Sequence, residues 1–518
     1  MKKKVLLFAV FLVLGILIVY SIQSVAGFAG RFIYPLDDSY IHLSMAKSFA
    51  ESGVWGITKH EFSSTTSSPF FTFLLSVLIK LFGDWQYIPL VANMVAGAAL
   101  LLVLHQYLKR YSLVTYAVVL LGVVFLMPLH LMIISGMEHV FHTLTMVLIL
   151  LFFREYLEKG NMRSFVALIL FSILATGFRY ESLFFIIFIC AYLFFIKKDF
   201  VKSILLGLFS LLPVVIYGLI SLQQGSFFLP NSLILKGNTF SGLGGFLLRI
   251  AGNAYRGLSV VILVLILLVQ IFITSKKENS FLDKIKKNAV ALVVLGGFSI
   301  HVLFANFGWL IRYEAYLVVL VLLSIAPFLE TVFENKKQMK FVFAAIILLF
   351  ATTFYIRFVK MLNYQTVASK NIYDQQIQLA DFLHQYYRNS KVVANDIGAI
   401  AYFNNIHLLD TFGLGSIEVA KLRKNDHAKF VKNQPLENYI KKTAINDHFE
   451  LAIVYEDWAH MPEDFTKVGT LSIQNNYICG GPTVTFYAIK KQDADKLRAQ
   501  LTEFSKQIPN DVSIKIVK

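Results

Sequence analysis

Charge is scarce in this chain of 518 residues: Asp, Glu, Lys and Arg together make up 15% of it, whereas hydrophobic residues make up 57%. Typical soluble domains are about 25% charged, so this chain has too few charges to cover an ordinary soluble surface. Cysteine is scarcer still, with two residues far apart in the sequence. No glycine-rich phosphate loop or zinc-ligand spacing occurs. The sequence therefore excludes a disordered chain and a disulfide-bonded secreted scaffold.

Long apolar runs are what the sequence has instead. The first run, 5–30, follows three lysines and exceeds the roughly 7–15 apolar residues of a signal peptide, which predicts an uncleaved span with a cytoplasmic N-terminus. A short run at 69–83 contains Lys80 and predicts a re-entrant or interfacial helix. Ten further runs predict ten more spans: 87–108, 112–134, 139–153, 164–178, 182–196, 203–222, 257–275, 288–309, 315–329 and 341–356.

The net charge of +16 is distributed unevenly among the loops. With eleven spans, the loops on the side of the N-terminus carry 19 basic and 7 acidic residues, whereas the loops on the other side are nearly balanced. Basic loops stay in the cytoplasm, so the charge indicates orientation. We prefer this interpretation to nucleic-acid binding and expect no nucleic-acid partner.

The tail beyond the last span has the length of one domain. Strand-like runs at 391–395, 451–455 and 484–489 alternate with helical stretches at 371–388 and 494–506, which predicts a small α/β domain outside the cell. The expected fold is thus a polytopic α-helical membrane protein with about 11 transmembrane helices, a re-entrant or interfacial helix and a C-terminal extracytoplasmic α/β domain. The predicted domains are a transmembrane module, 1–361, with a first extracytoplasmic loop at 28–86, and the α/β domain, 362–518.

Unusual polar segments fall on the non-cytoplasmic side of this topology. Charges at membrane depth are costly and are usually functional, so we expect these segments to meet in one catalytic pocket at the membrane surface. Two adjacent carboxylates suit a base or a metal ligand, and arginine and lysine suit a phosphate. The segments are 34–43 with Asp37 and Asp38, 63–69, 135–139, 177–181, 229–236, 309–314, 395–403 and 410–415.

These segments, in this order, resemble the GT-C superfamily of polytopic glycosyltransferases, and more closely the branch that contains the mycobacterial terminal arabinofuranosyltransferases. The run Asp37-Asp38-Ser39-Tyr40-Ile41 sits just after the first span, where that superfamily keeps its catalytic acid. The other matching elements are Ser135-Gly136-Met137-Glu138, Arg179-Tyr180-Glu181, Leu229-Pro230-Asn231-Ser232 to Lys236, and Asn395-Asp396-Ile397-Gly398-Ala399.

The resemblance implies an enzyme of the bacterial inner membrane that serves cell-envelope and cell-wall biogenesis. Its donor would be a polyprenyl-phosphate sugar in the bilayer, and its acceptor a glycan, lipid or protein outside. Asp37 is expected to act as general base and Asp38 to orient it, contact the acceptor or help to hold a divalent cation. Glu138 is the second candidate for acceptor or metal contact. No cofactor is certain, and the need for a cation stays open.

The remaining candidates are substrate-binding residues. Arg179, Lys236 and Arg312 are expected at the donor phosphate, with Glu181 beside Arg179. His42 lies one helical turn beyond Asp38 and is a candidate for the same pocket. Asp396 in the tail is expected to close over the site or bind the acceptor.

Each candidate has a structural alternative. The Asp37-Asp38 pair also suits the cap of a helix that starts at Ser39, and Glu138 also suits a structural pair with His139 or His142. Similar structural readings apply to the other candidates. Arg179 and Glu181 also suit an interfacial pair, His42 suits packing, and 395–399 suits a strand followed by a turn.

Two other functions compete with the enzyme. A transporter or flippase for a lipid-linked or polar substrate would place its polar residues near the bilayer midplane, often with repeat symmetry. A non-catalytic assembly or receptor subunit would not need the acidic pair.

Overall fold

The computed structural model describes residues 1–236, 242–335, 339–424 and 433–517. The chain divides into two compact units. The membrane unit comprises Met1–Ser21, Leu90–Val215 and Phe240–Gln365, and the sheet unit comprises Ile22–Pro89, Ile216–Thr239 and Thr366–Lys518. The sheet unit therefore contains both the first predicted loop and the tail.

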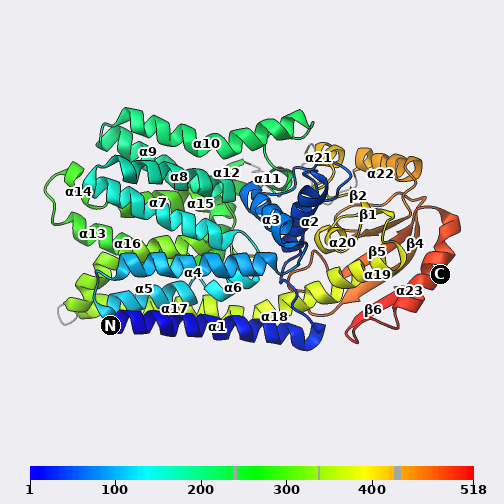
Figure 1. Cartoon of the computed structure of the whole chain (residues 1–518), viewed down its shortest axis with the longest axis horizontal. Coiled ribbons are helices and arrows are strands. Elements are labelled where there is room, and N and C mark those ends of the chain that lie inside the picture. Colours follow the sequence, from blue (N-terminus) through cyan, green and yellow to red (C-terminus); the bar gives the residue numbers. More distant parts are fainter. Residues whose placement is uncertain (237–241, 336–338, 425–432, 518) are drawn as a thin grey trace. The chain divides into compact units, whose positions relative to one another are not determined.

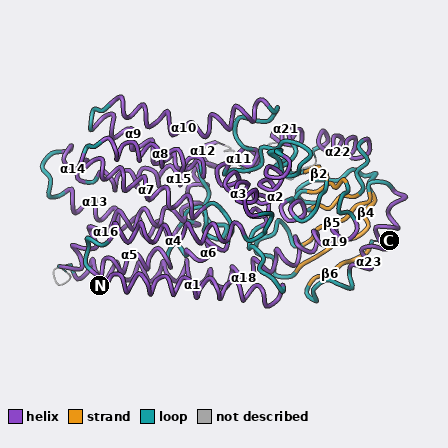
Figure 2. Tube along the Cα trace, viewed as in Figure 1, coloured by secondary structure: helices purple, strands orange, loops and turns teal. Residues whose placement is uncertain are grey.

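Helices make up the membrane unit because the bilayer offers no partner for backbone N–H and C=O groups, which a helix satisfies internally. Each of the eleven predicted runs is helical over most of its length (Figures 1 and 2). The run at 288–309 leaves its helix after Phe304. The helices of this part of the chain are α1 (Lys2–Ala29), α4 (Ile88–Leu108), α5 (Leu113–Phe125), α6 (Leu129–Ile134), α7 (His139–Lys159), α8 (Met162–Phe178), η1 (Tyr180–Ser182), α9 (Leu183–Ala191), η2 (Tyr192–Ile196), α10 (Phe200–Gln223), α12 (Gly242–Arg256), α13 (Leu258–Ser275), α14 (Phe281–Lys287), α15 (Ala289–Phe304), α16 (Ala315–Glu334), α17 (Lys340–Phe354) and η3 (Tyr355–Val359).

The predicted number of spans, eleven, is not confirmed. Among the described residues, eight helices are long and apolar enough to cross a membrane, and nine if α14 and α15, bent by 81°, form one span. The predicted runs at 164–178 and 182–196 fall in helices Met162–Phe178 and Tyr180–Ile196, which are shorter than the roughly 20 residues of a typical span. The last long helix continues without a break from Lys340 to Tyr386.

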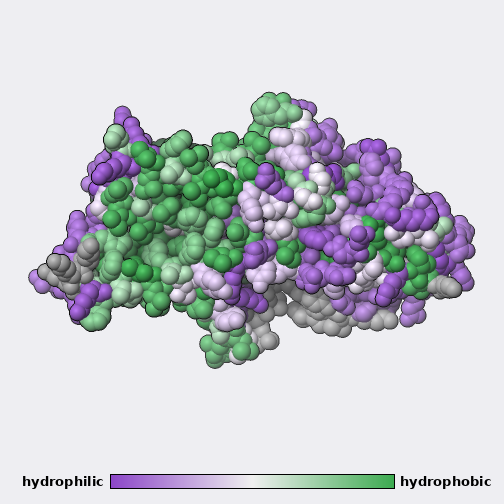
Figure 3. Space-filling view, turned by 90° about the horizontal axis from the view of Figure 1, so that it is seen from below, coloured by the Kyte–Doolittle hydropathy of each residue, from purple (hydrophilic) through white to green (hydrophobic). Residues whose placement is uncertain are grey.

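Helix α16 forms the core of the membrane unit. It packs against α5, α7, α13 and α15, and most of its side chains are buried. Helices that are apolar all round but lie at the edge of the bundle instead expose large apolar side chains, such as Phe8 of α1 and Val95 of α4. Figure 3 shows apolar side chains gathered over this part of the molecule, as a lipid-facing surface requires.

The sheet unit combines two short helices of the first loop with a six-stranded sheet. Helices α2 (Asp37–Ser52) and α3 (Pro69–Phe82) pack on each other, and α3 is the predicted interfacial run at 69–83. All strands among the described residues lie in the tail (Figure 2). The remaining elements of the chain are α11 (Asn231–Leu235), α18 (Lys360–Ile372), η4 (Tyr373–Ile377), α19 (Gln378–Tyr386), β1 (Lys391–Ala394), α20 (Gly398–Tyr402), β2 (His407–Asp410), α21 (Ile417–Lys424), α22 (Gln434–Asn446), β3 (Leu451–Val454), β4 (Thr466–Ile473), β5 (Thr483–Ala488), η5 (Lys491–Asp493), α23 (Ala494–Phe504) and β6 (Val512–Ile516).

The strand order is β2-β1-β3-β5-β4-β6, with parallel pairs around β1 and antiparallel pairs from β3 onward. Val393 and Ala452 pack with α21 and α22 on one face of the sheet. On the other face, Phe486 of β5 stacks edge-on against Phe382 of α19. The sheet is thus covered on both faces, which confirms the predicted small α/β domain.

Candidate active site

Asp37 opens α2, yet its side chain does not cap that helix. Its Oδ2 instead accepts a hydrogen bond from the backbone N–H of Gly398 at 2.6 Å, and its Oδ1 accepts one from Ala399 at 2.8 Å. Both amides belong to the first turn of α20 in the tail, where N–H groups lack helical partners and favour a carboxylate. The alternative that the acidic pair caps its own helix is therefore wrong for Asp37, whose carboxylate binds the first turn of α20 instead.

Asp396 forms a second carboxyl group beside Asp37, and the two side chains are hydrogen-bonded. Gln376 Nε2 donates to Asp396 Oδ2 at 2.8 Å, and the hydroxyl of Tyr455 lies 3.2 Å from the same oxygen. Asn395 fixes this corner by exchanging two hydrogen bonds of 3.0 Å with the backbone of Tyr455.

Burial sets the protonation of this pair. It raises the pKa of Asp396 well above the usual carboxyl range, and the neighbouring Asp37 charge raises it further. Burial also raises the pKa of Asp37, although the amides of Ala399 and Gly398 act in the opposite direction. The structure therefore favours one shared proton, with Asp396 as donor and Asp37 as acceptor.

Asp38, in contrast, lies at the edge of this cluster. Its side chain is 26% exposed, and its Oδ1 lies 3.5 Å from Lys236 Nζ. Lys236 reaches this place because its loop is anchored: the backbone N–H of Asn231 donates to Ser64 O at 2.7 Å. The side-chain amide of Asn231 donates to the backbone oxygens of Gly413 and Leu414, at 3.2 Å each.

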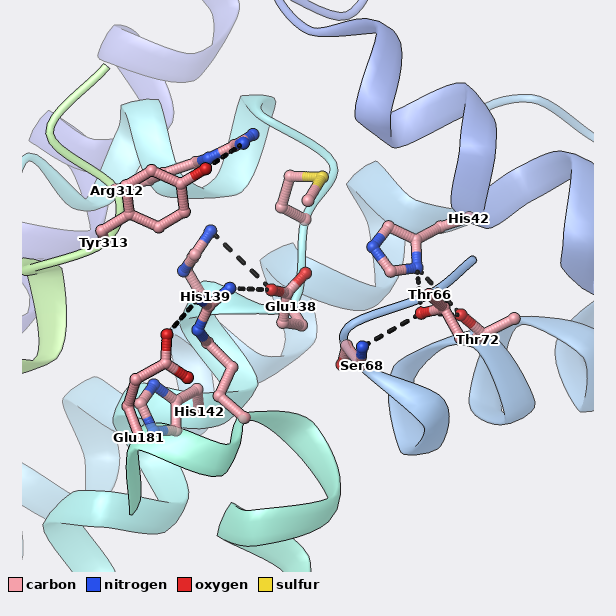
Figure 4. Close-up of polar contacts among 12 residues, drawn as sticks. His42, Thr66, Ser68, Thr72, Glu138, His139, His142, Glu181, Arg312 and Tyr313 are labelled. Carbon is pink, nitrogen blue, oxygen red and sulfur yellow. Dashed lines mark hydrogen bonds and ion pairs between the residues drawn. The ribbon is translucent and has the colours of Figure 1, made fainter. Parts of the chain in front are cut away.

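The serine- and threonine-rich segment 63–68 is buried except at Ser67. His42 Nδ1 lies 2.8 Å from Thr72 Oγ1 and 3.3 Å from Thr66 Oγ1 (Figure 4). The ring of His42 also stacks edge-on against Phe71. His42 is thus surrounded by hydroxyl groups and an aromatic ring, and its role at a substrate stays a prediction.

A second polar cluster lies within the membrane unit. Arg179 donates to Glu138 Oε1 and to Glu181 Oε1, both at 2.5 Å. Glu138 is fully buried, and His139 Nε2 lies 3.9 Å from the same Oε1 atom. The structural alternatives predicted for these residues are therefore present: Glu138 contacts His139, and Arg179 pairs with Glu181. Such a buried arrangement of one arginine and two glutamates is expensive to form and hence marks a functional candidate.

Tyr313 joins this cluster to Arg312. The guanidinium groups of Arg312 and Arg179 lie over the Tyr313 ring, 4.9 Å and 5.4 Å from its centroid, and Arg312 Nη2 donates to the Tyr313 hydroxyl at 3.1 Å (Figure 4). Both arginines are buried. Paired guanidinium groups on an aromatic surface suit a phosphate or carboxylate.

Arg312 follows a turn of uncommon backbone geometry. Gly308, Trp309, Leu310 and Ile311 all have positive φ, at 87°, 50°, 60° and 53°. The left-handed region costs a non-glycine residue about 1–2 kcal/mol. Strain of this kind gathers at functional sites, where the surrounding structure must hold it.

Sequence reasoning missed three groups that hold these sites: the backbone amides of Gly398 and Ala399, Tyr313, and Arg357. The last is a fully buried arginine 3.0 Å from Glu314. Arg357 carried a signal of its own, because it is a charge that directly follows the predicted span at 341–356.

The candidate metal ligands do not form a metal cluster. In the described parts of the chain, no group of three or more His, Cys, Asp or Glu side chains lies close enough to hold an ion. Asp38 has Lys236 beside it, and Glu138 has Arg179, so each carboxylate already has a cationic neighbour.

Comparisons with known proteins concern the fold of the chain. Residues 370–487 match a domain of unknown function, DUF8728. No curated protein matches the chain. The solved structures include ArnT from Cupriavidus metallidurans bound to undecaprenyl phosphate, with a TM-score of 0.53 and 12% identity over 93% of this chain and 98% of that chain. They also include an oligosaccharyltransferase of Archaeoglobus fulgidus in its apo form, with a TM-score of 0.49 and 12% identity over 98% of this chain and 76% of that chain.

The likeness to ArnT covers nearly the whole length of both chains. It therefore concerns the complete fold and not one shared domain. The arabinofuranosyltransferase branch that the motifs suggest stays a prediction. At the level of architecture, the chain shares the overall fold of ArnT, and eight of its described helices are long and apolar enough to cross a membrane.

Proposed function

We propose that this protein is a membrane glycosyltransferase that transfers a sugar from a polyprenyl-phosphate donor to a hydroxyl group of an acceptor outside the cytoplasm. The acceptor would be a glycan, a lipid or a protein. In this proposal the N-terminus faces the cytoplasm and the tail faces outward, as the basic loops indicate. The fold likeness to a protein bound to undecaprenyl phosphate supports the donor class.

One observation carries the proposal: the first-loop acidic pair has two different environments. Asp37 is 8% exposed and oriented by two backbone amides, whereas Asp38 is more exposed and lies beside a lysine. Neighbouring carboxyl groups with different environments suit different roles in one reaction. A buried carboxylate with a raised pKa is also a stronger base than a solvated one.

In the proposed reaction, Asp37 accepts the proton of the acceptor hydroxyl. At the same time, the oxygen of that hydroxyl forms a bond to the anomeric carbon of the donor. The bond from that carbon to the phosphate oxygen breaks, and the polyprenyl phosphate leaves with the electron pair. Each oxygen of Asp37 accepts one amide hydrogen bond, and the oxygen that does not also accept from Asp396 keeps a second lone pair for the proton. The transition state gains positive charge on the sugar, which a neighbouring carboxylate stabilises.

Asp38 and Lys236 would line the path of the substrates. A lysine ammonium attracts phosphate as a point charge, and the Asp38 carboxylate keeps it in place at 3.5 Å. The same proposal includes Arg179 and Arg312 at the donor phosphate, with Glu138 and Glu181 beside Arg179. It also includes His42 as a substrate-binding residue in the pocket of Asp38, and Asp396 as a residue that closes over the site or binds the acceptor.

The test measures the release of polyprenyl phosphate, a product that does not depend on which sugar is transferred. Purified full-length protein in lipid nanodiscs is given a panel of polyprenyl-phosphate pentoses and hexoses with a cell-envelope extract as acceptor. The wild-type protein should release polyprenyl phosphate, and Asp37→Asn should lower that rate by about 10²–10⁴-fold, the usual contribution of a general base.

Ser39→Ala is the matched control, since it changes the same helix turn but removes no carboxylate. Undiminished release by Asp37→Asn would contradict the role of Asp37. Movement of the intact donor across a vesicle membrane, with no release from any sugar, would support the transporter or flippase instead.

A further inference from the structure

The turn before Arg312 has an unusual backbone conformation for the membrane unit. Among the described residues, 308–311 are the only four successive positions with positive φ, and three of them are not glycine. One of the three, Ile311, is branched at Cβ, which makes this conformation a genuine outlier. A conformation of this kind persists only if surrounding groups over-determine it.

Glu314 and Arg357 supply that constraint. Glu314 Oε2 accepts the backbone N–H of Gly308 at 3.0 Å, which ties the start of the turn. Arg357 Nη2 donates to the backbone oxygen of Ile311 at 3.2 Å, which ties its end. The two side chains join each other through Arg357 Nη1 and Glu314 Oε1 at 3.0 Å, and both are fully buried. One ion pair therefore closes the turn from both sides.

The same guanidinium fixes the turn to two other segments. Arg357 Nε donates to the backbone oxygen of Leu126, just after α5, and its Nη1 lies 3.2 Å from Ser259 Oγ in α13. A planar guanidinium can make these contacts at once, whereas a lysine ammonium cannot reproduce their geometry. Arg357 thus connects the turn to the framework of the bundle.

The turn leads directly into the two residues that carry the candidate anion site. Arg312 and Tyr313 come next in the chain, and the Tyr313 ring lies under the guanidinium groups of both Arg312 and Arg179. A shift of the turn would change the place of Arg312 relative to Arg179.

We propose that Arg357 and Glu314 are positioning residues, which hold the left-handed turn 308–311 so that Arg312 and Tyr313 present a binding surface for the phosphate of the lipid donor. The proposal rests on the proposed function for its ligand. It adds two residues that touch neither the sugar nor the phosphate and act through Arg312.

Two readouts test it, and only one of them involves the ligand. The first is acrylamide quenching of Trp309, obtained as the difference between a protein and its Trp309→Phe counterpart, because Trp309 lies in the turn and is 50% exposed. The second is the affinity of purified full-length protein for undecaprenyl phosphate. The variants are Arg357→Lys, Arg312→Gln and their combination. Arg154→Lys is the control, since Arg154 forms a partly exposed pair with Glu158 at 2.9 Å.

We expect Arg357→Lys to change the quenching of Trp309 and to weaken the affinity by about tenfold or more. Arg312→Gln should weaken the affinity to a similar extent and leave the quenching as it was. The double variant should bind no more weakly than Arg312→Gln alone, because Arg357 acts through Arg312. Glu314→Gln is the milder second variant if Arg357→Lys does not fold, and it should shift both readouts in the same direction.

Unchanged Trp309 quenching and unchanged affinity in Arg357→Lys would overturn the proposal. So would full additivity of the two substitutions, which would mean that Arg357 acts independently of Arg312. Failure of the proposed function looks different: the wild-type protein would not bind undecaprenyl phosphate, whereas Arg357→Lys would still alter Trp309.

Discussion

The backbone amide of Gly398 lies 2.6 Å from the carboxylate of Asp37, although 361 residues separate them in the sequence. A Cβ atom at Gly398 would lie 2.3 Å from the Asp37 backbone oxygen and 2.5 Å from its Oδ2. Only glycine therefore allows the tail to approach the first loop so closely.

Gly398→Ala should displace Asp37 and lower both stability and activity. The forced contact costs about 1–3 kcal/mol, as overpacking of a filled site usually does. A thermal unfolding curve and the phosphate-release assay check this. Gly481→Ala is the matched control, because its Cβ would meet Tyr455 at an ordinary 3.4 Å. Equal stability and activity of the two alanine variants would refute the close-packing argument.

The Asp37 and Asp396 pair predicts a pH dependence of stability. Both folded-state pKa values lie above the ordinary carboxyl value, so the folded state holds a proton that the unfolded chain has already lost. Stability from this pair is therefore greatest at low pH and falls as pH rises through the raised values. The charged groups facing Asp396 are Asp37 and Asp38, with the hydroxyl of Tyr455 beside them.

Asp396→Asn keeps the shape of the side chain and removes its titration. The melting temperature of this variant should decline less between pH 5 and pH 9 than that of the wild-type protein. Glu463→Gln, in the same tail, is a suitable control because Glu463 lies outside the Asp37 and Asp396 cluster. Parallel melting curves for wild type and Asp396→Asn would contradict the shared proton.

Asp38 and Lys236 should matter for activity far more than for stability. Their side chains are 26% and 44% exposed, and exposed ion pairs contribute about 0–1 kcal/mol. Lys236→Gln should therefore leave the melting temperature nearly unchanged while reducing the release of polyprenyl phosphate about tenfold. Lys47→Gln provides the comparison, since Lys47 pairs with Asp84 at 2.7 Å in the same unit. Equal activity of both glutamine variants would remove Lys236 from the site.

The buried cluster around Arg179 predicts an order of destabilisation. Arg179→Met leaves two carboxylates without their shared cation and should cost about 3–5 kcal/mol. Glu138→Gln should cost less, because Arg179 keeps its contact with Glu181. The double variant Arg179→Met with Glu138→Gln should recover part of the loss. Thermal unfolding in nanodiscs gives the order, and a more stable Arg179→Met than Glu138→Gln would reverse it.

The apolar pattern was sufficient to predict where the helices lie. All eleven predicted runs are helical, because a run without charges has no other stable form in lipid. The number of spans was not equally predictable. The predicted runs at 164–178 and 182–196 are shorter than the roughly 20 residues of a typical span, and helices Met162–Phe178 and Tyr180–Ile196 extend them only slightly.

The acidic and basic side chains of the site could be predicted from the sequence, but the groups that position these side chains could not. Asp37, Asp38 and Lys236 stood out because charges are rare near apolar runs. The partners of Asp37 are backbone amides, which every residue carries, so no residue type could reveal them. Arg357 was missed for another reason: its partner Glu314 and its turn 308–311 are brought together only by folding.

The amides that hold Asp37 belong to residues 361 and 362 positions later in the chain, and this has a consequence for biosynthesis. The acidic pair leaves the ribosome early, but Gly398 and Ala399 follow only after most of the polypeptide has been made and inserted. A nascent chain that ends before these two residues would carry the aspartates with neither amide partner, so the arrangement around Asp37 can form only once residues 398 and 399 have been delivered.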